Sequence, residues 1–329
     1  MLLYGLMMML CSVVMAEYSM QDHLLHQCAA QGTIGGMAFA LNHGANINAK
    51  NAFQATALSI ASRHGHGEAV KFLFRHQAQM DPSALLAAVQ YGHAKVVQVL
   101  LDHGADPNGR DKEGITMLMH AVMGQHLGVI RTLLNQEEGI NLQDNGDRTA
   151  SVLAIDHKVQ INAQTSQGLT ALMMASMRGL EKVIILLIQH DANVHLKEKK
   201  NGNTALVFAA EKGYARVVEF LWKRAGASVH VQNALEQTPL MVAAENGRKM
   251  VVQGLLGGMR MVDVKPYVNL RDQFKQTALM LAAEEGHATI VDLLLENGAD
   301  PRLLNHRGQT ALMLAAFHHH TNVMKRLMQ

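Results

Sequence analysis

Histidines are the most obvious candidates for chemistry in this 329-residue chain, which contains 19 of them. The run His318, His319 and His320 invites comparison with a metal or haem site. Consecutive residues of a helix point in different directions, so these three side chains would not share one ligand face. His93, His126 and His287 recur at equivalent places in a repeated pattern, where a ring nitrogen can bond exposed backbone. We therefore expect structural histidines and no cofactor, with metal or haem ligation as the alternative.

Common catalytic motifs are missing from the sequence. It has no Gly-x-Ser-x-Gly, His-Glu-x-x-His, Gly-x-Gly-x-x-Gly or Cys-x-x-Cys segment and no Walker-type phosphate loop. With only two cysteines, a disulfide scaffold and a four-cysteine zinc module are excluded. Cys28 stands beside Ala29 and Ala30, which favours a buried apolar role over a reactive thiol. The sequence thus predicts a protein that is not an enzyme; a cryptic active site is the alternative.

The overall composition is that of a folded chain with nearly balanced charge. Apolar residues make up 49% and charged residues 17%, which excludes bulk disorder. Lys and Arg total 29 against 27 Asp and Glu, for a net charge of +2. This balance lacks the basic excess that nucleic-acid binding requires. We expect a protein partner, with no nucleic acid and no small-molecule substrate.

The first residues resemble a secretory signal. Residues 2–16 are apolar or small and carry no charge, and they are shorter than the about 20 residues that span a bilayer. Val14-Met15-Ala16 fits a cleavage site, although no basic residue precedes the apolar run. The first basic residue is Lys50, so no positive charge holds this end in the cytoplasm. We expect a signal peptide over 1–16 and export to the periplasm or the medium. The alternative is a cytoplasmic protein whose N-terminal helix caps the fold.

A pattern of 33–34 residues repeats along the chain. Its copies begin at Thr56, Ser83, Thr116, Thr149, Thr170, Thr204, Thr238, Thr277 and Thr310, with a degenerate first copy from His23. In one copy, Thr277 can cap a first helix with a narrow Leu and Ala face, and a denser apolar stripe from Ile290 marks a second helix. Gly298 suits a left-handed C-terminal cap. Because one unit cannot bury both faces alone, we expect the units to stack into an all-α repeat solenoid with short β-hairpin loops.

These segments resemble the ankyrin-repeat family. The family's Thr-Pro-Leu-His opening appears as Thr238-Pro239-Leu240-Met241, its Ala-Ala-x-x-Gly-His step as Ala282–His287, and its Gly-Ala-Asp-x-Asn end as Gly104–Asn108. The resemblance covers about residues 22–329 and implies about nine repeats, one of them truncated. The opening His is mostly Met here, which predicts apolar packing in place of the bond that this His makes in the family.

Irregular spacings predict where the array departs from its period. The 27-residue step after Thr56 lacks a hairpin tip, and the 39-residue step after Thr238 adds a surface loop at 257–266. The 21-residue step after Thr149 lacks about one helix. We therefore expect N-terminal repeats over 17–148, a truncated repeat and weak junction over 149–161, and C-terminal repeats over 162–329.

The resemblance implies that partners bind the concave face, through the hairpin tips and an exposed pair at the end of each first helix. The tip positions are Phe53, Lys112, Glu113, Ile115, Leu169, Leu235, Gln273, Phe274, His306 and Arg307. The helix pairs are Arg63 and His64, Gln90 and Tyr91, Met177 and Arg178, Glu211 and Lys212, Glu245 and Asn246, and Glu284 and Glu285.

Among these residues, Phe53, Tyr91, Leu235 and Phe274 place large apolar side chains where a purely solubilising surface would be polar. They predict anchors for a partner. The alternative is that each packs on a neighbouring tip. Trp222 falls in a second helix and is expected in the core. The resulting hypothesis is a monomeric, non-enzymatic scaffold for protein–protein interaction, and its alternative is an exported accessory protein that inhibits or stabilises another protein.

Overall fold

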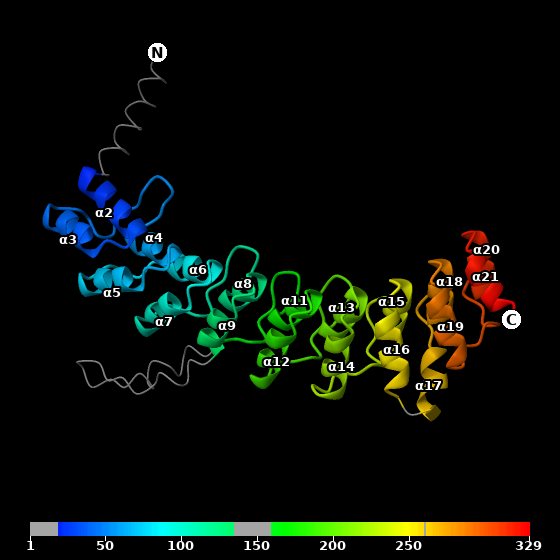
Figure 1. Ribbon diagram of the computed structural model, residues 1–329. Coiled ribbons are helices and arrows are strands. Elements are labelled where there is room, and N and C mark those ends of the chain that lie inside the picture. Colours follow the sequence, from blue (N-terminus) through cyan, green and yellow to red (C-terminus); the bar gives the residue numbers. More distant parts are fainter. Residues whose placement is uncertain (1–18, 135–158, 260) are drawn as a thin grey trace, which may run out of the picture. The chain divides into compact units, whose positions relative to one another are not determined.

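The computed structural model describes residues 19–134, 159–259 and 261–329 (Figure 1). The chain divides into two compact units, residues 1–160 and 161–329. The predicted signal segment lies outside the described residues, as does nearly all of the predicted junction at 149–161. No described helix is both long and apolar enough to cross a membrane.

Helices of the first unit form consecutive antiparallel pairs. They are α2 (Met20–Gln31), α3 (Ile34–Asn42), α4 (Ala57–Arg63), α5 (Gly67–Arg75), α6 (Pro82–Gln90), α7 (Ala94–Asp102), α8 (Met117–Met123) and α9 (Leu127–Leu134). Within each pair the two helices pack together, as α4 does with α5. The first helices α2, α4, α6 and α8 pack in one row, and the second helices α3, α5, α7 and α9 pack in another. This unit is therefore a two-row stack of helix pairs.

The second unit repeats the same plan and adds one helix. Its helices are α11 (Ala171–Met177), α12 (Glu181–Gln189), α13 (Ala205–Lys212), α14 (Ala215–Lys223), α15 (Pro239–Glu245), α16 (Lys249–Gly257), α17 (Met261–Val268), α18 (Ala278–Glu284), α19 (Ala288–Glu296), α20 (Ala311–Phe317) and α21 (Thr321–Leu327). The first-helix row is α11, α13, α15, α18 and α20, and the second-helix row is α12, α14, α16, α19 and α21. The expected all-α repeat solenoid is confirmed.

The repeat starting at Thr277 shows why the sequence forms these pairs. The Thr277 hydroxyl accepts a hydrogen bond from the Met280 amide at 3.3 Å and so caps α18. The small and branched residues of α18 are buried on the side that meets α15 and α20. Gly298 ends α19 with φ of 87°, a conformation that suits glycine because it has no Cβ.

Histidines join one repeat to the next. The Nε2 atom of His93 donates to the carbonyl oxygen of Arg63 at 2.9 Å, and His126 and His287 bond Gln90 and Glu245 in the same way at 2.9 and 3.0 Å. The His93 ring lies over Gly65, where a Cβ would come within 2.6 Å of its Nδ1 atom. The structural role expected for these three histidines is confirmed, since each satisfies a carbonyl at the end of a first helix.

Hairpin loops project from each stack as tight turns. In the described residues no run of paired strand residues occurs, and one isolated bridge joins Arg110 and Thr116. The 27-residue step does lack a tip, because Asp81 caps α6 directly and its carboxylate also accepts from the Thr56 hydroxyl at 2.7 Å. The segments on either side of each turn are too short to form a run of paired strand residues. The loops therefore fold back like β-hairpins but do not form a sheet.

The predicted surface loop at 257–266 is wrong for most of its length, because α17 occupies residues 261–268. Val264, Tyr267 and Val268 are buried, and the Tyr267 hydroxyl donates to the Val229 carbonyl at 3.1 Å. Their spacing of three and four residues is that of one helix face. Pro266 and the Gly257-Gly258 pair suggested a loop, yet the buried face outweighs the one amide that Pro266 lacks.

Methionines at the fourth position of the repeat opening are mostly buried, as the sequence analysis predicts. Met119, Met173, Met241 and Met280 are each 1% exposed. Met313 of α20 is 53% exposed, because α18 is the only first helix that packs on α20 among the described residues. Apolar packing therefore replaces the family's polar residue in four repeats, and the last described repeat differs.

Candidate functional site

The candidate site on each unit is the surface made by its tips and by the C-terminal ends of its first helices, which we call the tip surface of that unit. The tips are residues 51–55, 111–115, 165–169, 198–203, 233–237, 272–276 and 305–309. Each begins with a side chain whose oxygen accepts backbone amides of its own turn, as Asp272 Oδ1 does from Phe274 and Gln276 at 2.9 and 2.8 Å. The sequence thus shapes each tip locally.

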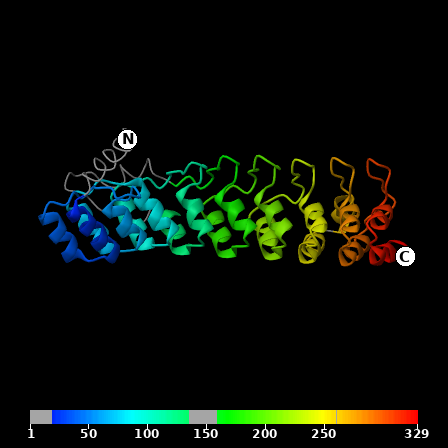
Figure 2. The same cartoon turned by 90° about the horizontal axis from the view of Figure 1, so that it is seen from above.

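The tips of the second unit follow one another along one edge of the stack (Figure 2), and backbone hydrogen bonds tie neighbouring tips together. The amides of Lys199, Ala234, Gln273 and His306 donate to the carbonyls of Gln167, Asn201, Leu235 and Phe274, at 2.9, 2.7, 3.1 and 3.0 Å. Such bonds fix the tips before any partner arrives. In the first unit the tipless connection at 76–81 separates the tips 51–55 and 111–115.

All four predicted apolar anchors are exposed on this surface. Phe53 is 90% exposed, Tyr91 50%, and Leu235 and Phe274 41% each. The Arg63 guanidinium lies over the Tyr91 ring, 5.0 Å from its centroid, and the Phe274 ring lies 5.6 Å from that of His306. Tyr91 and Phe274 are therefore steadied by neighbours while still presenting apolar area, and Phe53 stands clear of the fold.

The other predicted binding positions fall into exposed and half-buried groups. Arg63, His64, Lys112, Glu113, Arg178, Lys212, Glu285, His306 and Arg307 are exposed, whereas Met177, Glu211 and Glu284 are half-buried. Glu211 pairs with Lys212 at 2.8 Å, and Glu284 accepts from the Gln276 side-chain amide at 2.8 Å. The first unit thus brings together Arg63, His64 and Tyr91, and the second brings Leu235 and Phe274 near the carboxylates.

Carboxylates crowd one another on the second unit's tip surface. Burial raises the pKa of Glu245, and the nearby charges of Glu285, Asp272 and Glu284 add to the effect. Burial also raises the pKa of Asp272. Sequence reasoning missed Asp272, although its place at the start of a tip, where neighbouring tips carry Asn233 and Asn305, is a readable signal.

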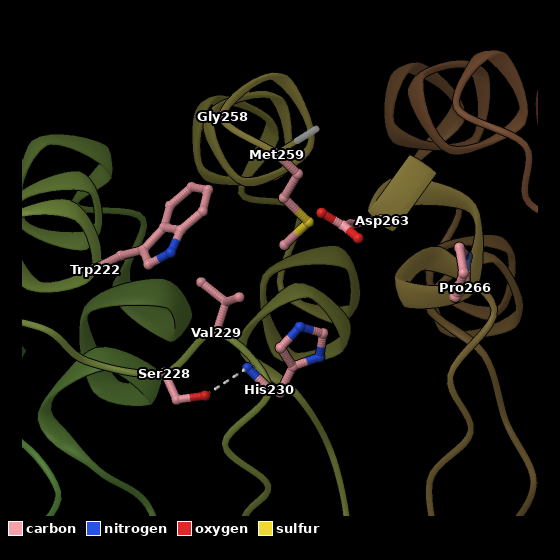
Figure 3. Close-up of a pocket in the computed structure, with 8 residues that line it drawn as sticks. All are labelled: Trp222, Ser228, Val229, His230, Gly258, Met259, Asp263 and Pro266. Carbon is pink, nitrogen blue, oxygen red and sulfur yellow. Dashed lines mark hydrogen bonds between the residues drawn. The ribbon is translucent and has the colours of Figure 1, made fainter. Parts of the chain in front are cut away.

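A second candidate is a cavity of about 500 Å³ beside α17 (Figure 3). It is lined by Trp222, Ser228, Val229, His230, Gly258, Met259, Asp263 and Pro266. Trp222 is only half-buried, so its predicted core position is wrong: its ring abuts Gly258, where a Cβ would come within 2.6 Å, and one side faces the cavity. The His230 ring meets the edge of Tyr267, and its amide donates to the Ser228 hydroxyl at 3.2 Å.

Neither candidate has the geometry of a metal centre. Over the described ranges, no three His, Cys, Asp or Glu side chains are grouped to hold an ion. Cys28 is a buried free thiol, 6% exposed, in agreement with its predicted apolar role. The tip surface is consequently a candidate for binding by shape and charge.

A family model described as ankyrin repeats (3 copies) matches residues 25–111, 85–160, 145–233 and 240–329. The chain is also similar to E3 ubiquitin-protein ligase XBAT33 of Arabidopsis thaliana, at 27% identity over 197 residues. These residues are 57% of this chain and 33% of that protein, so the chain spans about a third of the relative's length.

Proposed function

Because the chain belongs to the ankyrin-repeat family, whose repeats act in protein–protein interaction, we propose that it is a scaffold that binds a partner protein through the tip surface. The observation that carries this proposal is the row of bonded tips in the second unit, which holds Leu235 and Phe274 partly exposed. A surface whose backbone is fixed in advance loses less conformational entropy on binding.

Exposed aromatic residues supply the binding energy in this proposal. Tyr91 and Phe274 keep large apolar area in solvent, and aromatic side chains dominate many protein interfaces when they enter a pocket on the partner. Charged neighbours such as Arg63 and Glu285 would form the polar rim of the interface.

We propose further that the protein has no catalytic activity of its own. The relative's name describes a ubiquitin ligase, but two thirds of that protein lies outside the matched region. The family model matches nearly all of residues 25–329, so most of the aligned residues of this chain are repeat residues. The likeness therefore supports a shared repeat array, and ligase activity is not proposed for this chain.

The test compares partner capture by the wild-type chain with capture by Tyr91→Ala and Phe274→Ala variants. Partners are purified on the immobilised chain from the source organism and identified by mass spectrometry, and the melting temperature of each variant is measured in parallel. Removing a true anchor costs about 2 kcal/mol or more of binding.

Met250→Ala is the matched control, because Met250 is 65% exposed on α16, in the second-helix row. The proposal expects capture to fall strongly in the two aromatic variants while their melting temperatures stay close to that of the wild type, and to persist in the control. Equal capture by all variants, or losses that only follow unfolding, would contradict it.

Export and a monomeric state are also proposals. The uncharged apolar run before Ala16 and the late first basic residue, Lys50, support export. N-terminal sequencing of the protein from its native host would find Glu17 first, whereas an intact Met1 in cytosolic protein would contradict export and favour the cytoplasmic alternative. An exported chain would act as a regulatory or protective accessory to another protein. Analytical ultracentrifugation tests the expected monomer.

A further inference from the structure

Part of the second unit's tip surface carries a local excess of negative charge that the whole chain does not. Glu236, Glu245, Asp272, Glu284 and Glu285 lie on the tips 233–237 and 272–276 and on the ends of α15 and α18. The complete chain has a net charge of +2. The acidity is therefore a property of this surface and is opposite in sign to the bulk charge.

Few cations among the described residues face these carboxylates. Lys212 pairs with Glu211, His318 Nε2 lies 3.7 Å from Glu284, and His306 lies close enough to influence Asp272. Lys275 belongs to the same tip as Asp272 and Arg307 to the next tip, and both side chains are exposed. The five carboxylates outnumber the two exposed basic side chains of these tips, Lys275 and Arg307, so the local balance stays negative.

Two of the glutamates are held in position by glutamine side chains of the tip in the same repeat. The side-chain amide of Gln237 donates to Glu245 at 3.1 Å, and that of Gln276 donates to Glu284 at 2.8 Å. The same tip-to-helix arrangement thus occurs in two successive repeats. Carboxylates fixed in this way lose little rotamer freedom when a ligand binds them.

Asp272 adds a buried carboxylate oxygen without a donor. The residue is 4% exposed, its Oδ1 atom accepts two amides, and its Oδ2 atom has no hydrogen-bond partner among the described residues. Neighbouring tips carry an amide here, and the Nδ2 groups of Asn233 and Asn305 donate to Gln237 and Gln309 at 3.2 Å. An unpaired buried carboxylate is costly, and a cation brought by a ligand would offset that cost.

The tip 111–115 shows where that oxygen points. Asp111 makes the same two Oδ1 bonds, and its Oδ2 atom accepts from His120 Nε2 on α8 at 3.0 Å. Leu281 of α18 stands nine residues after Asp272, as His120 stands nine after Asp111, and it offers no donor. The free oxygen of Asp272 is therefore directed at the first-helix side of the tip surface, where Glu284 lies one turn further along.

We infer that this acidic part of the tip surface is a docking site for a basic segment of a partner protein, whose Arg and Lys side chains bind the carboxylates of successive repeats between the Leu235 and Phe274 tips. The inference rests on the function proposed above and specifies the chemistry of the partner. Arg suits the site well, because its planar guanidinium donates two parallel hydrogen bonds to one carboxylate.

The experiment measures binding of a fluorescein-labelled oligo-arginine peptide to the full chain by fluorescence anisotropy. One variant, Glu245→Gln with Glu284→Gln and Glu285→Gln, removes three charges from the site and keeps the side-chain shapes. Its matched control, Glu181→Gln with Glu219→Gln and Glu296→Gln, removes three charges from α12, α14 and α19 of the second-helix row. An oligo-glutamate peptide serves as the control probe.

The expected result is that the site variant binds oligo-arginine about tenfold more weakly, because three carboxylate charges are lost together, and that the control variant stays within about twofold of wild type. Asp272→Asn should also weaken binding, by about threefold, without lowering the melting temperature. Oligo-glutamate should not bind. Higher salt should weaken oligo-arginine binding to the wild-type chain.

No oligo-arginine binding by the wild-type chain would overturn the inference, as would equal losses in the site and control variants. If the inference fails while Phe274→Ala still abolishes partner capture, the scaffold function stands and only the basic character of the partner is wrong. If oligo-arginine binds as expected while both aromatic variants capture partners normally, the acidic site stands and the anchor hypothesis fails.

Discussion

The two units use one repeat plan to present different tip surfaces. The first unit places Arg63 over Tyr91 and has a tipless connection at 76–81 between its tips. The second unit ties its tips together through backbone bonds and gathers carboxylates around Glu245 and Asp272. The first surface combines Arg63 with an aromatic ring and has separated tips, whereas the second has a continuous row of tips with carboxylates grouped on two of its repeats.

The difference lies in the tips and helix ends, because the interior is nearly the same in both units. Leu118 of α8 and Leu279 of α18 are each 1% exposed at the same repeat position. Histidines bond the preceding repeat in both units, as His93 and His287 show. The buried residues and the bridging histidines thus stabilise the stack in both units, while the residues of the tips and helix ends can differ between them.

The largest expected effect tests whether the units unfold separately. Tyr267→Ala removes a ring that is 1% exposed, and we expect it to lower the free energy of unfolding of the second unit by about 3–5 kcal/mol. The chain has one tryptophan, Trp222, which lies in the second unit. In a urea titration, the midpoint of the Trp222 fluorescence transition should move to a lower urea concentration. The part of the circular dichroism transition that comes from the first unit should keep its midpoint.

Tyr267→Phe is the control, since it removes only the hydroxyl that donates to Val229 and should cost about 1 kcal/mol. A single transition that moves as a whole in both signals would show that the units unfold together, against the predicted weak junction.

A second prediction gives the two units opposite signs for the same substitution. Asp111→Asn should destabilise the first unit by about 1 kcal/mol, because the carboxylate loses its bond with His120. Asp272→Asn should stabilise the second unit by about 1 kcal/mol, because the new amide can donate to Gln276 as Asn233 does to Gln237. Urea midpoints measure both. If both substitutions lowered the urea midpoint, the Oδ2 atom of Asp272 would have a hydrogen-bond partner in solution.

A third prediction separates the two exposed phenylalanines. Phe53→Ala should change the free energy of unfolding by less than about 0.5 kcal/mol, because Phe53 is 90% exposed. Phe274→Ala should cost about 0.5–1 kcal/mol, because its ring contacts that of His306. Thermal unfolding of both variants provides the measurement. A loss at Phe53 as large as that at Phe274 would show that the tip 51–55 has packing partners.

The smallest expected effect concerns pH. Burial lowers the pKa of His26 below its ordinary 6.5, so the unfolded chain binds more protons just below that value and acid destabilises the first unit. Burial raises the pKa of Glu245 above 4.5 and that of Asp272 above 3.8. The folded second unit then binds more protons than the unfolded chain, so mild acid stabilises it through these two groups.

Urea titrations at pH 7 and pH 5 test this difference, with Trp222 fluorescence reporting on the second unit. His26→Gln should reduce the acid sensitivity of the first unit, and Glu245→Gln should reduce the gain in the second. Identical pH responses of the two units would contradict the assignment.

Sequence alone predicted the repeat plan because each copy carries its own signals. Thr277 as a cap and Gly298 as a stop act within one helix pair, and the repetition of these signals fixes the stacking. The exposure of Phe53, Tyr91, Leu235 and Phe274 was also readable, since tip positions have few neighbours.

What the sequence did not reveal depends on contacts between repeats. The helix α17 forms because Tyr267 reaches Val229, which no local pattern discloses, and Pro266 argued against it. Trp222 is half-buried because Gly258 and α17 leave a cavity beside it. Asp272 is distinctive only by comparison with Asn233, Asn305 and the His120 partner of Asp111.

The histidine bonds between repeats also bear on how the chain folds. They join residues 30 to 42 positions apart, from His93 with Arg63 to His287 with Glu245. Chains whose contacts are this local pay little loop-closure entropy and fold fast for their length. Two consecutive repeats are enough to complete such a bond, so each unit can acquire its native contacts step by step while the ribosome is still adding the repeats that follow.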